Sequence, residues 1–320
     1  MTPDLATLHR HLEAETARPF AASVGVIVDA VRERHGAAVA AVLFYGSCLH
    51  GPDPGEPGNE AVIDLYVLVE RYREVYASRL AALANAILPP NVFYLEHATE
   101  AGRARTKYAV MTLAQFRRGT SAAALHPSLW ARFCQPVRLA YARDAAVREA
   151  VIGALAQAVT TMVGRTAPLL GPAFTAADLW QRAFRETYRA ELRAERAARA
   201  TQIYAWNAAR YQALTGPALA AAGVAVAGKT ADGRFQVAIP ARARAFEALR
   251  WVARRAIGKP LTVLRLIKGA FTFDGAVEYA LWKIERHSGI RPRLSAWQRR
   301  HPVLASPLVV WRLYRRGALR

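Results

Sequence analysis

A glycine-serine pair and one aspartate are the residues that first suggest chemistry in this sequence. Gly46 and Ser47 follow one apolar run, and Asp64 lies inside the next, AVIDLYVLV. A glycine after a strand lets backbone amides come close to a phosphate, and a serine hydroxyl adds a donor. A carboxylate in an apolar run is costly to bury unless it is paired or bound to a metal. The pattern predicts a phosphate and metal site, although a plain turn beside an exposed strand edge would look the same.

Lys107 and Cys48 are the next candidates. Lys107 follows a strand and a basic turn in the stretch VFYLEHATEAGRARTKYAVMT, and its amine could reach a phosphate or simply lie in solvent. Cys48 has no neighbouring histidine or other base, so we interpret it as a packing residue and not as a nucleophile.

Strands and helices in the first part of the chain must position these groups. Residues 39–45, 61–69 and 92–97 are apolar runs typical of strands, and residues 1–35 carry leucines and valines at helical spacing. Strands that alternate with helices predict a mixed α/β domain that ends near Ala140.

The remaining chain is predicted to be mainly helical. Residues 147–210 are rich in Ala, Arg and Glu, and the final third again has a helical pattern. Between them, residues 224–240 form a predicted β-hairpin with Asp232 and Gly233 in its turn. Helices followed by a two-stranded wing suggest a winged-helix module.

Composition narrows the class of partner. The 320 residues carry 44 Lys and Arg against 24 Asp and Glu, a net charge of +20. Such an excess favours polyanions, namely nucleic acid, nucleoside triphosphates or an anionic membrane, although an arginine-rich proteome would also contribute to it. A hydrophobic content of 53% excludes a disordered chain, and two cysteines exclude a disulfide framework or a zinc cluster. With no secretory or membrane-spanning pattern, we expect a soluble or peripheral protein in a reducing compartment.

Several motifs, taken in order, resemble one family. The stretches FYGSCLH, VIDLYVLV, GRARTKYAVMT and LWARFCQPVRL are similar to elements of the mitochondrial-type phosphatidate cytidylyltransferases. These are CDP-diacylglycerol synthases of the nucleotidyltransferase fold. Their elements are a Gly-Ser turn after a strand, an acid in an apolar strand, Lys-Tyr-Gly-Val and Arg-x-x-Lys-Pro-Val. Further on, YRAELRAE resembles the family's Tyr-x-Gly-Asp-Phe-Arg segment and LRLIKGAFT its Lys-Gly-x-x-Thr segment, so the resemblance covers roughly residues 40–285.

The chain departs from the family pattern at a few positions that concern the metal ligands and the lipid acceptor. Tyr66 stands where the wider superfamily has a second strand acid. The other differing positions are Cys48, Ala109, Gln135, Ala190 and Glu191.

The resemblance implies a reaction and a role for each matched residue. CTP and phosphatidate would give CDP-diacylglycerol and pyrophosphate, with Mg²⁺ as cofactor. Asp64 would be the principal metal carboxylate and Glu191 the second, with Lys268 as a further catalytic residue. The remaining assignments are nucleotide binding by Gly46, Ser47, Lys107 and Arg193, and lipid phosphate binding by Arg265 and Lys268. Without the resemblance, Glu191 in ETYRAELRAER would be interpreted as part of a salt-bridged helix surface.

The resemblance also implies domains and a location. We expect a nucleotidyltransferase-fold domain over residues 1–140, a helical winged-helix-like domain over 141–255, and a C-terminal helical segment over 256–320 that completes the site. Beyond Glu285 there are nine arginines and no acid, and residues 306–320 contain Trp and Tyr beside apolar residues. That composition suits a helix in an anionic interface, so we expect peripheral attachment to the cytoplasmic side of the bacterial inner membrane. A C-terminal helix packed on its own domain, and a homodimer, both remain open.

Three other functions stay open at this point. The same fold could transfer a nucleotidyl group to another phosphate acceptor. The winged helix and the charge could serve nucleic-acid binding, although we expect no nucleic-acid partner because the charge is spread along the chain. The missing second strand acid also allows an inactive transferase.

Overall fold

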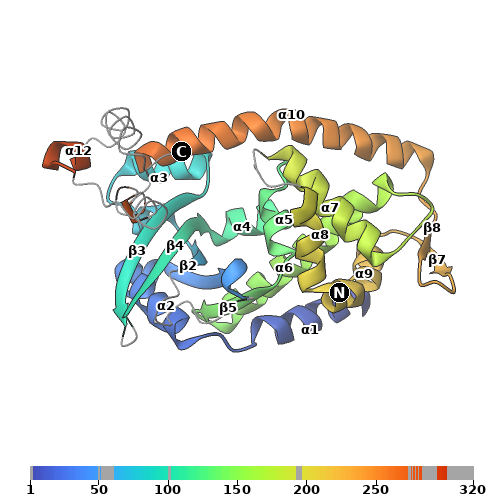
Figure 1. Cartoon of the computed structure of the whole chain (residues 1–320), viewed down its shortest axis with the longest axis horizontal. Helices are drawn as coiled ribbons and strands as arrows, with labels where there is room; N and C mark the ends of the chain where they lie inside the picture. The colour runs from blue at the N-terminus through green and yellow to red at the C-terminus, as the bar shows by residue number, and fades with distance from the viewer. Residues whose placement is uncertain are drawn as a thin grey trace.

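The computed structural model describes residues 3–49, 51, 61–99, 102–191, 197–272, 275, 277, 279, 281–282 and 294–300 (Figure 1). Within these residues the protein is a mixed α/β fold, which confirms the predicted class. The predicted membrane-contacting tail, residues 306–320, lies outside them.

A five-stranded sheet carries the candidate chemistry. Its strand order is β3-β4-β2-β1-β5. The strands are β1 (Val39–Tyr45), β2 (Val62–Val69), β3 (Asn91–Thr99), β4 (Gly102–Thr112) and β5 (Val137–Ala142). The three predicted strands are therefore confirmed. The predicted basic turn before Lys107 is wrong, because those residues belong to β4, where they pair with β3.

One pair in this sheet is parallel. β2 runs antiparallel to β1 but parallel to β4, and it reaches β4 through the helix α3 (Arg79–Ile87) and strand β3. A parallel pair needs such a crossover, whereas an antiparallel pair needs only a short loop. The register places Asp64 between Tyr45 on β1 and Lys107 on β4.

Helices cover both faces of the sheet because the side chains of β1 alternate between two cores. Val42 and Phe44 face α2 (Ala22–His35), while Ala41 and Leu43 face the larger core. That larger core also holds residues of α1 (Pro3–Thr16). The helical prediction for residues 1–35 is confirmed, with α1 and α2 in this range.

The larger core continues into the helical part of the chain. It joins Leu43 and Tyr66 of the sheet to apolar residues of several helices. These helices are α4 (Leu113–Thr120), α5 (Ser128–Phe133), α6 (Ala145–Thr166), α7 (Ala176–Ala190), α8 (Ala197–Trp206) and α9 (Ala208–Ala221). Residues on both sides of position 140 thus share one core, and the domain division stays a prediction.

One helix in the described part of the chain is long and apolar enough to cross a membrane. It spans Ala145–Leu169, and 61% of its apolar window is buried inside the protein. This segment is α6 with its following turn, and it packs against α1, α4, α5 and α9 in the core.

The predicted hairpin is present. A small sheet has the order β6-β8-β7, formed by β6 (Ala173–Phe174), β7 (Val226–Lys229) and β8 (Phe235–Val237). Gly233 in its turn has a φ of 77°, a conformation that glycine adopts without strain. The hairpin prediction is therefore confirmed.

A single long helix, α10 (Ala241–Thr272), runs along one side of the molecule from the hairpin to α3 (Figure 1). Near its start, Glu247 is buried and binds Arg254 at 2.6 Å and Arg165 of α6 at 3.1 Å. Trp251 donates from its indole nitrogen to the Arg165 carbonyl at 2.8 Å. These contacts fix α10 on the helical part of the protein. A short helix, α12 (Ala296–Arg300), follows later in the chain.

Candidate functional site

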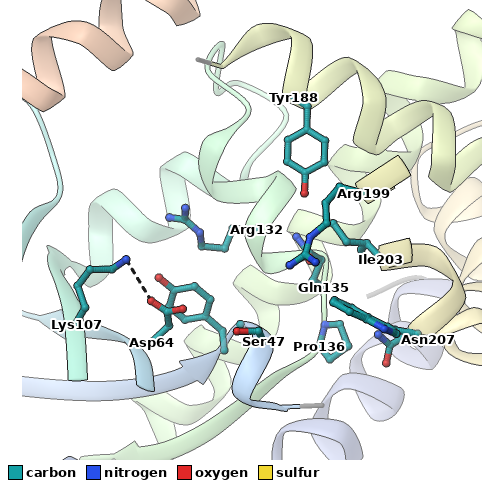
Figure 2. Close-up of a pocket in the computed structure, with 13 residues that line it drawn as sticks. Ser47, Asp64, Lys107, Arg132, Gln135, Pro136, Tyr188, Arg199, Ile203 and Asn207 are labelled. Atoms are coloured by element: carbon teal, nitrogen blue, oxygen red, sulfur yellow. Dashed lines mark ion pairs between the residues drawn. The ribbon is translucent and has the colours of Figure 1, made fainter. Parts of the chain in front are cut away.

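A polar pocket of about 330 Å³ lies where β1, β2 and β4 meet α5 and α8. Figure 2 shows Asp64 and Ser47 on its floor, with Lys107, Arg132 and Arg199 around the same open space. We call it the Asp64 pocket. Its lining residues are Tyr45, Gly46, Ser47, Asp64, Lys107, Arg132, Gln135, Pro136, Tyr188, Arg199, Ile203, Trp206 and Asn207. It brings together the predicted Gly46, Ser47, Asp64 and Lys107.

Gly46 lies where any side chain would run into the Asp64 carboxylate. Its φ is 94°, and a Cβ built on it would lie 2.9 Å from Asp64 Oδ2. Any side chain here would therefore be strained by both the backbone conformation and the contact. Ser47 follows in a short turn and is exposed. The glycine is required where the chain leaves β1 and passes over Asp64.

The Asp64 carboxylate is held between opposing influences. Its Oδ1 lies 3.6 Å from Lys107 Nζ, and the two residues are register partners on β2 and β4. Burial raises the pKa of Asp64, and the charges of Lys107 and Arg132 act against that rise. The neighbouring cations thus favour the negative form of Asp64 against burial, and its side chain is still 28% exposed.

A second pocket, of about 480 Å³, lies on the α10 side of Arg132. Part of its wall is apolar and comes from Pro89, Pro90, Met111, Leu125 and Leu129. Its polar lining residues are Tyr66, Gln115, Arg118, His126, Ser128, Arg132, Glu191, Thr262 and Arg265. We call it the Arg265 pocket. It brings together the predicted Glu191 and Arg265.

Arg132 lines both pockets and is their shared wall. Burial acts to lower the pKa of its guanidinium, but the pKa is raised on balance, because interactions with Tyr45, Tyr66 and the carboxylates of Glu191 and Asp64 outweigh burial. Arg132 is therefore a permanent positive charge between the carboxylate of one pocket and that of the other.

The two predicted carboxylates do not share a pocket. Asp64 lines one, and Glu191, directly after the end of α7, lines the other. Tyr66 lies two residues beyond Asp64 on β2 and is buried beside Arg132 and Arg265, whose charges counter the burial-induced rise of its pKa. Arg193, predicted to bind nucleotide, lies outside the described residues.

The two predicted lipid-phosphate residues differ in what they contact. Arg265 Nη1 lies 3.3 Å from Ser128 Oγ and 3.4 Å from His126 Nδ1 at the wall of its pocket. Lys268 Nζ instead donates to Asn85 Oδ1 at 3.0 Å, to Leu88 O at 2.7 Å and to Pro90 O at 2.8 Å.

An ammonium group has three donors, so these three bonds use all of them. Burial and the charge of Arg265 lower the pKa of Lys268 to about 8. In this structure Lys268 joins α10 to the turn between α3 and β3.

Cys48 lies in surroundings that make its thiol unreactive. Its Sγ donates to Val62 O at 3.3 Å, and burial together with the charge of Asp64 raises its pKa to about 11. A thiol with such a pKa stays protonated near neutrality and is a poor nucleophile. These values agree with the packing interpretation.

Sequence reasoning missed several residues of the Asp64 pocket. Arg132 is the Arg of the Arg-x-x-Lys-Pro-Val element, so its motif was recognisable, but it received no role. Arg199, Trp206 and Asn207 come from α8 and the start of α9. Arg199 lies over the Trp206 ring at 4.8 Å. No spacing in the sequence connects these residues to Gly46, because only tertiary packing brings α8 to the sheet.

The residues present fit a magnesium ion only together with a phosphate ligand. No group of three or more His, Cys, Asp or Glu side chains forms a cluster within the described ranges. In the same ranges, Asp64 is the one carboxylate lining its pocket. Mg²⁺ is commonly held by one or two carboxylates plus substrate phosphates and water. Asp64 therefore fits as the protein ligand of a nucleotide-bound ion and would hold a free ion poorly.

Comparison with known proteins adds no family: no family model matches the chain, and no curated protein matches it in sequence.

Proposed function

We propose that the protein is a phosphatidate cytidylyltransferase that converts CTP and phosphatidate to CDP-diacylglycerol and pyrophosphate at a membrane surface. One observation carries the proposal: Arg132 is the shared wall of a polar pocket containing Asp64 and a partly apolar pocket containing Arg265. A transfer between two phosphate compounds needs both to approach one centre of positive charge. The motif resemblance supports the choice of substrates.

The Asp64 pocket is assigned to CTP. Lys107, Arg132 and Arg199 supply positive charge for the triphosphate, and Gly46, which packs against Asp64, adds its backbone to the lining of the pocket. The ring of Trp206 and the amide of Asn207 line the same pocket and are suited to stack on a base and to hydrogen-bond its edge.

The Arg265 pocket is assigned to phosphatidate. Arg265, Arg118 and Arg132 would hold the phosphate, and the apolar residues would contact the first part of the acyl chains. Glu191 in this pocket would orient Arg132 and Arg265, since its negative charge favours the charged form of both guanidinium groups, although burial still lowers the pKa of Arg265. Its role as a metal ligand, implied by the family resemblance, remains part of the proposal to be tested.

The chemistry follows from these positions. A phosphatidate oxygen attacks the α-phosphorus of CTP, a new P–O bond forms, and the bond between the α-phosphorus and the bridging oxygen breaks. A phosphate dianion already carries the attacking electron pair, so no general base is required. Bound Mg²⁺, held by Asp64 and phosphate oxygens, would neutralise charge on the triphosphate. Arg132 would stabilise the charge that develops between the two phosphates.

The fold assignment belongs to this proposal. The mixed sheet, with a Gly-Ser turn after β1 and an acid on β2, is consistent with the nucleotidyltransferase fold that the resemblance implies. The helices around the β7–β8 hairpin are consistent with a winged-helix-like module. The membrane-contacting role of residues 306–320 is likewise a proposal.

The test is pyrophosphate release by the full chain with CTP, Mg²⁺ and phosphatidate in detergent micelles. Asp64→Ala should reduce turnover by about a thousandfold or more, because the metal-bound triphosphate loses its protein ligand. Asp178→Ala is the matched control, since that carboxylate caps α7 outside both pockets.

Glu191→Ala separates the two roles of that residue. A loss of Mg²⁺ dependence would assign Glu191 to the metal, while a higher KM for phosphatidate would assign it to the Arg265 pocket. Parallel reactions with glycerol 3-phosphate and an isoprenoid phosphate test another acceptor. Turnover with one of these compounds, and none with phosphatidate, would show that the acceptor in the proposal is wrong and that the reaction type is right.

A further inference from the structure

The long helix α10 is amphipathic, but it packs its polar face against the protein and exposes its apolar face. A surface helix normally turns its apolar face to the core and its charged face to water. In α10 the inward side carries Glu247, Arg254, Arg265 and Lys268, and protein groups bond all four. At Gly258 the same side comes so close to α7 that an added Cβ would lie 2.1 Å from the Ala190 carbonyl oxygen. The polar face of α10 is thus its packed face.

The outward face of α10 is apolar over most of its length. The large side chains on it are 42–65% exposed, and with about 3.6 residues per turn their positions fall in a stripe on one side of the helix. They are Phe246, Leu249, Val252, Ile257, Val263, Leu264 and Ile267. At 1.5 Å per residue this stripe is about 32 Å long. Monomeric soluble proteins rarely expose so extended an apolar surface.

The neighbouring helix α3 widens the stripe into a patch. Leu80, Leu83 and Ile87 of α3 are 56–78% exposed. Lys268 joins the end of α10 to Asn85 within α3, and to Leu88 and Pro90 directly after it, so the two helices lie side by side at this end. We call these ten side chains the α10–α3 surface.

The charges around the surface select the partner. Arg242 and Lys259 are exposed on α10, Arg250 is half-buried, and Arg79 is exposed at the start of α3. The single acid of α10, Glu247, is buried in its pairs with Arg254 and Arg165. An apolar stripe with a basic rim matches an anionic bilayer, into which apolar side chains insert while Lys and Arg contact headgroups.

We propose that the α10–α3 surface docks on a bilayer that contains anionic phospholipid, with α10 lying in the plane of the membrane. The Arg265 pocket lies next to this surface, because Pro89 and Pro90 follow α3, and Thr262 and Arg265 belong to α10. Docking would bring lipid headgroups to the mouth of that pocket. The docking itself is independent of the proposed reaction, and only the delivery of a lipid acceptor rests on the proposed function.

Vesicle binding by the full chain tests the docking. Leu249→Glu and Leu264→Glu should each lower partitioning onto phosphatidylcholine vesicles containing phosphatidylglycerol by about tenfold or more, since burying a charge replaces burying a leucine. Lys259→Glu should lower it by about fivefold, and only when phosphatidylglycerol is present. Val226→Glu on β7 is the control, because Val226 is an exposed apolar residue outside the surface. The thermal midpoint of every variant shows that it folds.

Two results would overturn the docking proposal. One is wild-type vesicle binding by both leucine variants, which would assign the membrane contact to another part of the chain. The other is a wild-type dimer, seen by light scattering, that the leucine variants split into monomers, which would make the surface an interface between two copies.

Activity separates this inference from the proposed function. With short-chain phosphatidate in solution, Leu249→Glu should keep wild-type turnover, while turnover on vesicle phosphatidate falls about tenfold. If even the wild type turned over neither substrate, the transferase proposal would fail. Vesicle binding would still test whether the α10–α3 surface docks on a bilayer.

Discussion

The Asp64 pocket and the Arg265 pocket share one arginine and differ in almost everything else. The first is lined by the sheet, α5 and α8, and it contains one carboxylate and three cations. The second is bounded by the turn after α3 and by α10, and much of its wall is apolar. Arg132 thus presents its positive charge to both pockets, while the surroundings on each side of it suit a different ligand. Four predictions test that division.

The largest effect is expected at the shared wall. Arg132→Ala should lower kcat by about a thousandfold and raise the KM of both substrates, because one guanidinium serves both pockets. Arg199→Ala should raise the KM of CTP by about tenfold and leave the KM of phosphatidate unchanged. Steady-state kinetics with each substrate varied in turn give these values. If Arg132→Ala affected only one substrate, the wall would not be shared.

A slightly smaller effect is expected on the Asp64 side from Gly46→Ala. The new Cβ would meet the Asp64 carboxylate at a backbone φ of 94°, which should cost about 1–3 kcal/mol of stability. Turnover should fall by about a hundredfold as the carboxylate is displaced. Urea unfolding and initial rates measure the two effects. Gly228→Ala is the control, because nothing lies within 4 Å of its added Cβ.

In the Arg265 pocket and beside it, we expect two cations of α10 to have different roles, Arg265 in substrate binding and Lys268 in stability. Arg265→Ala should raise the KM of phosphatidate about tenfold with little change in the free energy of unfolding. Lys268→Met should cost about 2–4 kcal/mol of stability, because three acceptors, one of them on the buried Asn85, lose their donor. Denaturant titration and KM values distinguish them. If Lys268→Met instead raised the KM of phosphatidate and kept full stability, Lys268 would be assigned to lipid phosphate binding.

The smallest effect concerns Cys48 and reports on the charge of Asp64. Its raised pKa, about 11, means that the thiolate forms only in strongly alkaline solution, so alkylation by iodoacetamide at pH 8 should be slow and should speed up as the pH rises. Asp64→Asn removes one cause of that rise, which lowers the pKa and should accelerate alkylation at pH 8 by a few-fold. Mass spectrometry of the modified peptide follows the rate, and Cys48→Ala should keep nearly full turnover. An unchanged alkylation rate in Asp64→Asn would show that burial alone raises the pKa of the Cys48 thiol.

Local sequence pattern was sufficient for the parts of this fold that depend on local structure. β1 has the predicted limits, and the β7–β8 hairpin follows from its turn residues. β4 was missed because Arg103, Arg105 and Lys107 obscure its alternation, and a strand with charged residues on one face is not distinguished from a basic turn. Its pairing with β2 depends on contacts 43 residues apart, such as the bond from Thr106 Oγ1 to the Ile63 carbonyl at 2.8 Å.

The candidate site was predictable to a similar degree. Gly46, Ser47, Asp64 and Lys107 do line one pocket, since their types and order already suggested phosphate chemistry. The separation of Asp64 from Glu191 depends on where α5 places Arg132, which no spacing encodes. The three bonds of Lys268 were equally hidden, because the acceptors are backbone carbonyls and one amide far away in the chain.

The parallel pairing of β2 with β4 has a consequence for the order in which the protein becomes competent to bind. Asp64 meets Lys107 only after α3 and β3 have crossed over and β4 has joined the sheet. Contacts between distant segments form late, because the intervening loop must first be closed. A nascent chain that has released β1 and β2 alone would carry the carboxylate without its lysine partner. If the proposed function holds, nucleotide binding should therefore appear only once the sheet is complete, and binding would report that folding is finished.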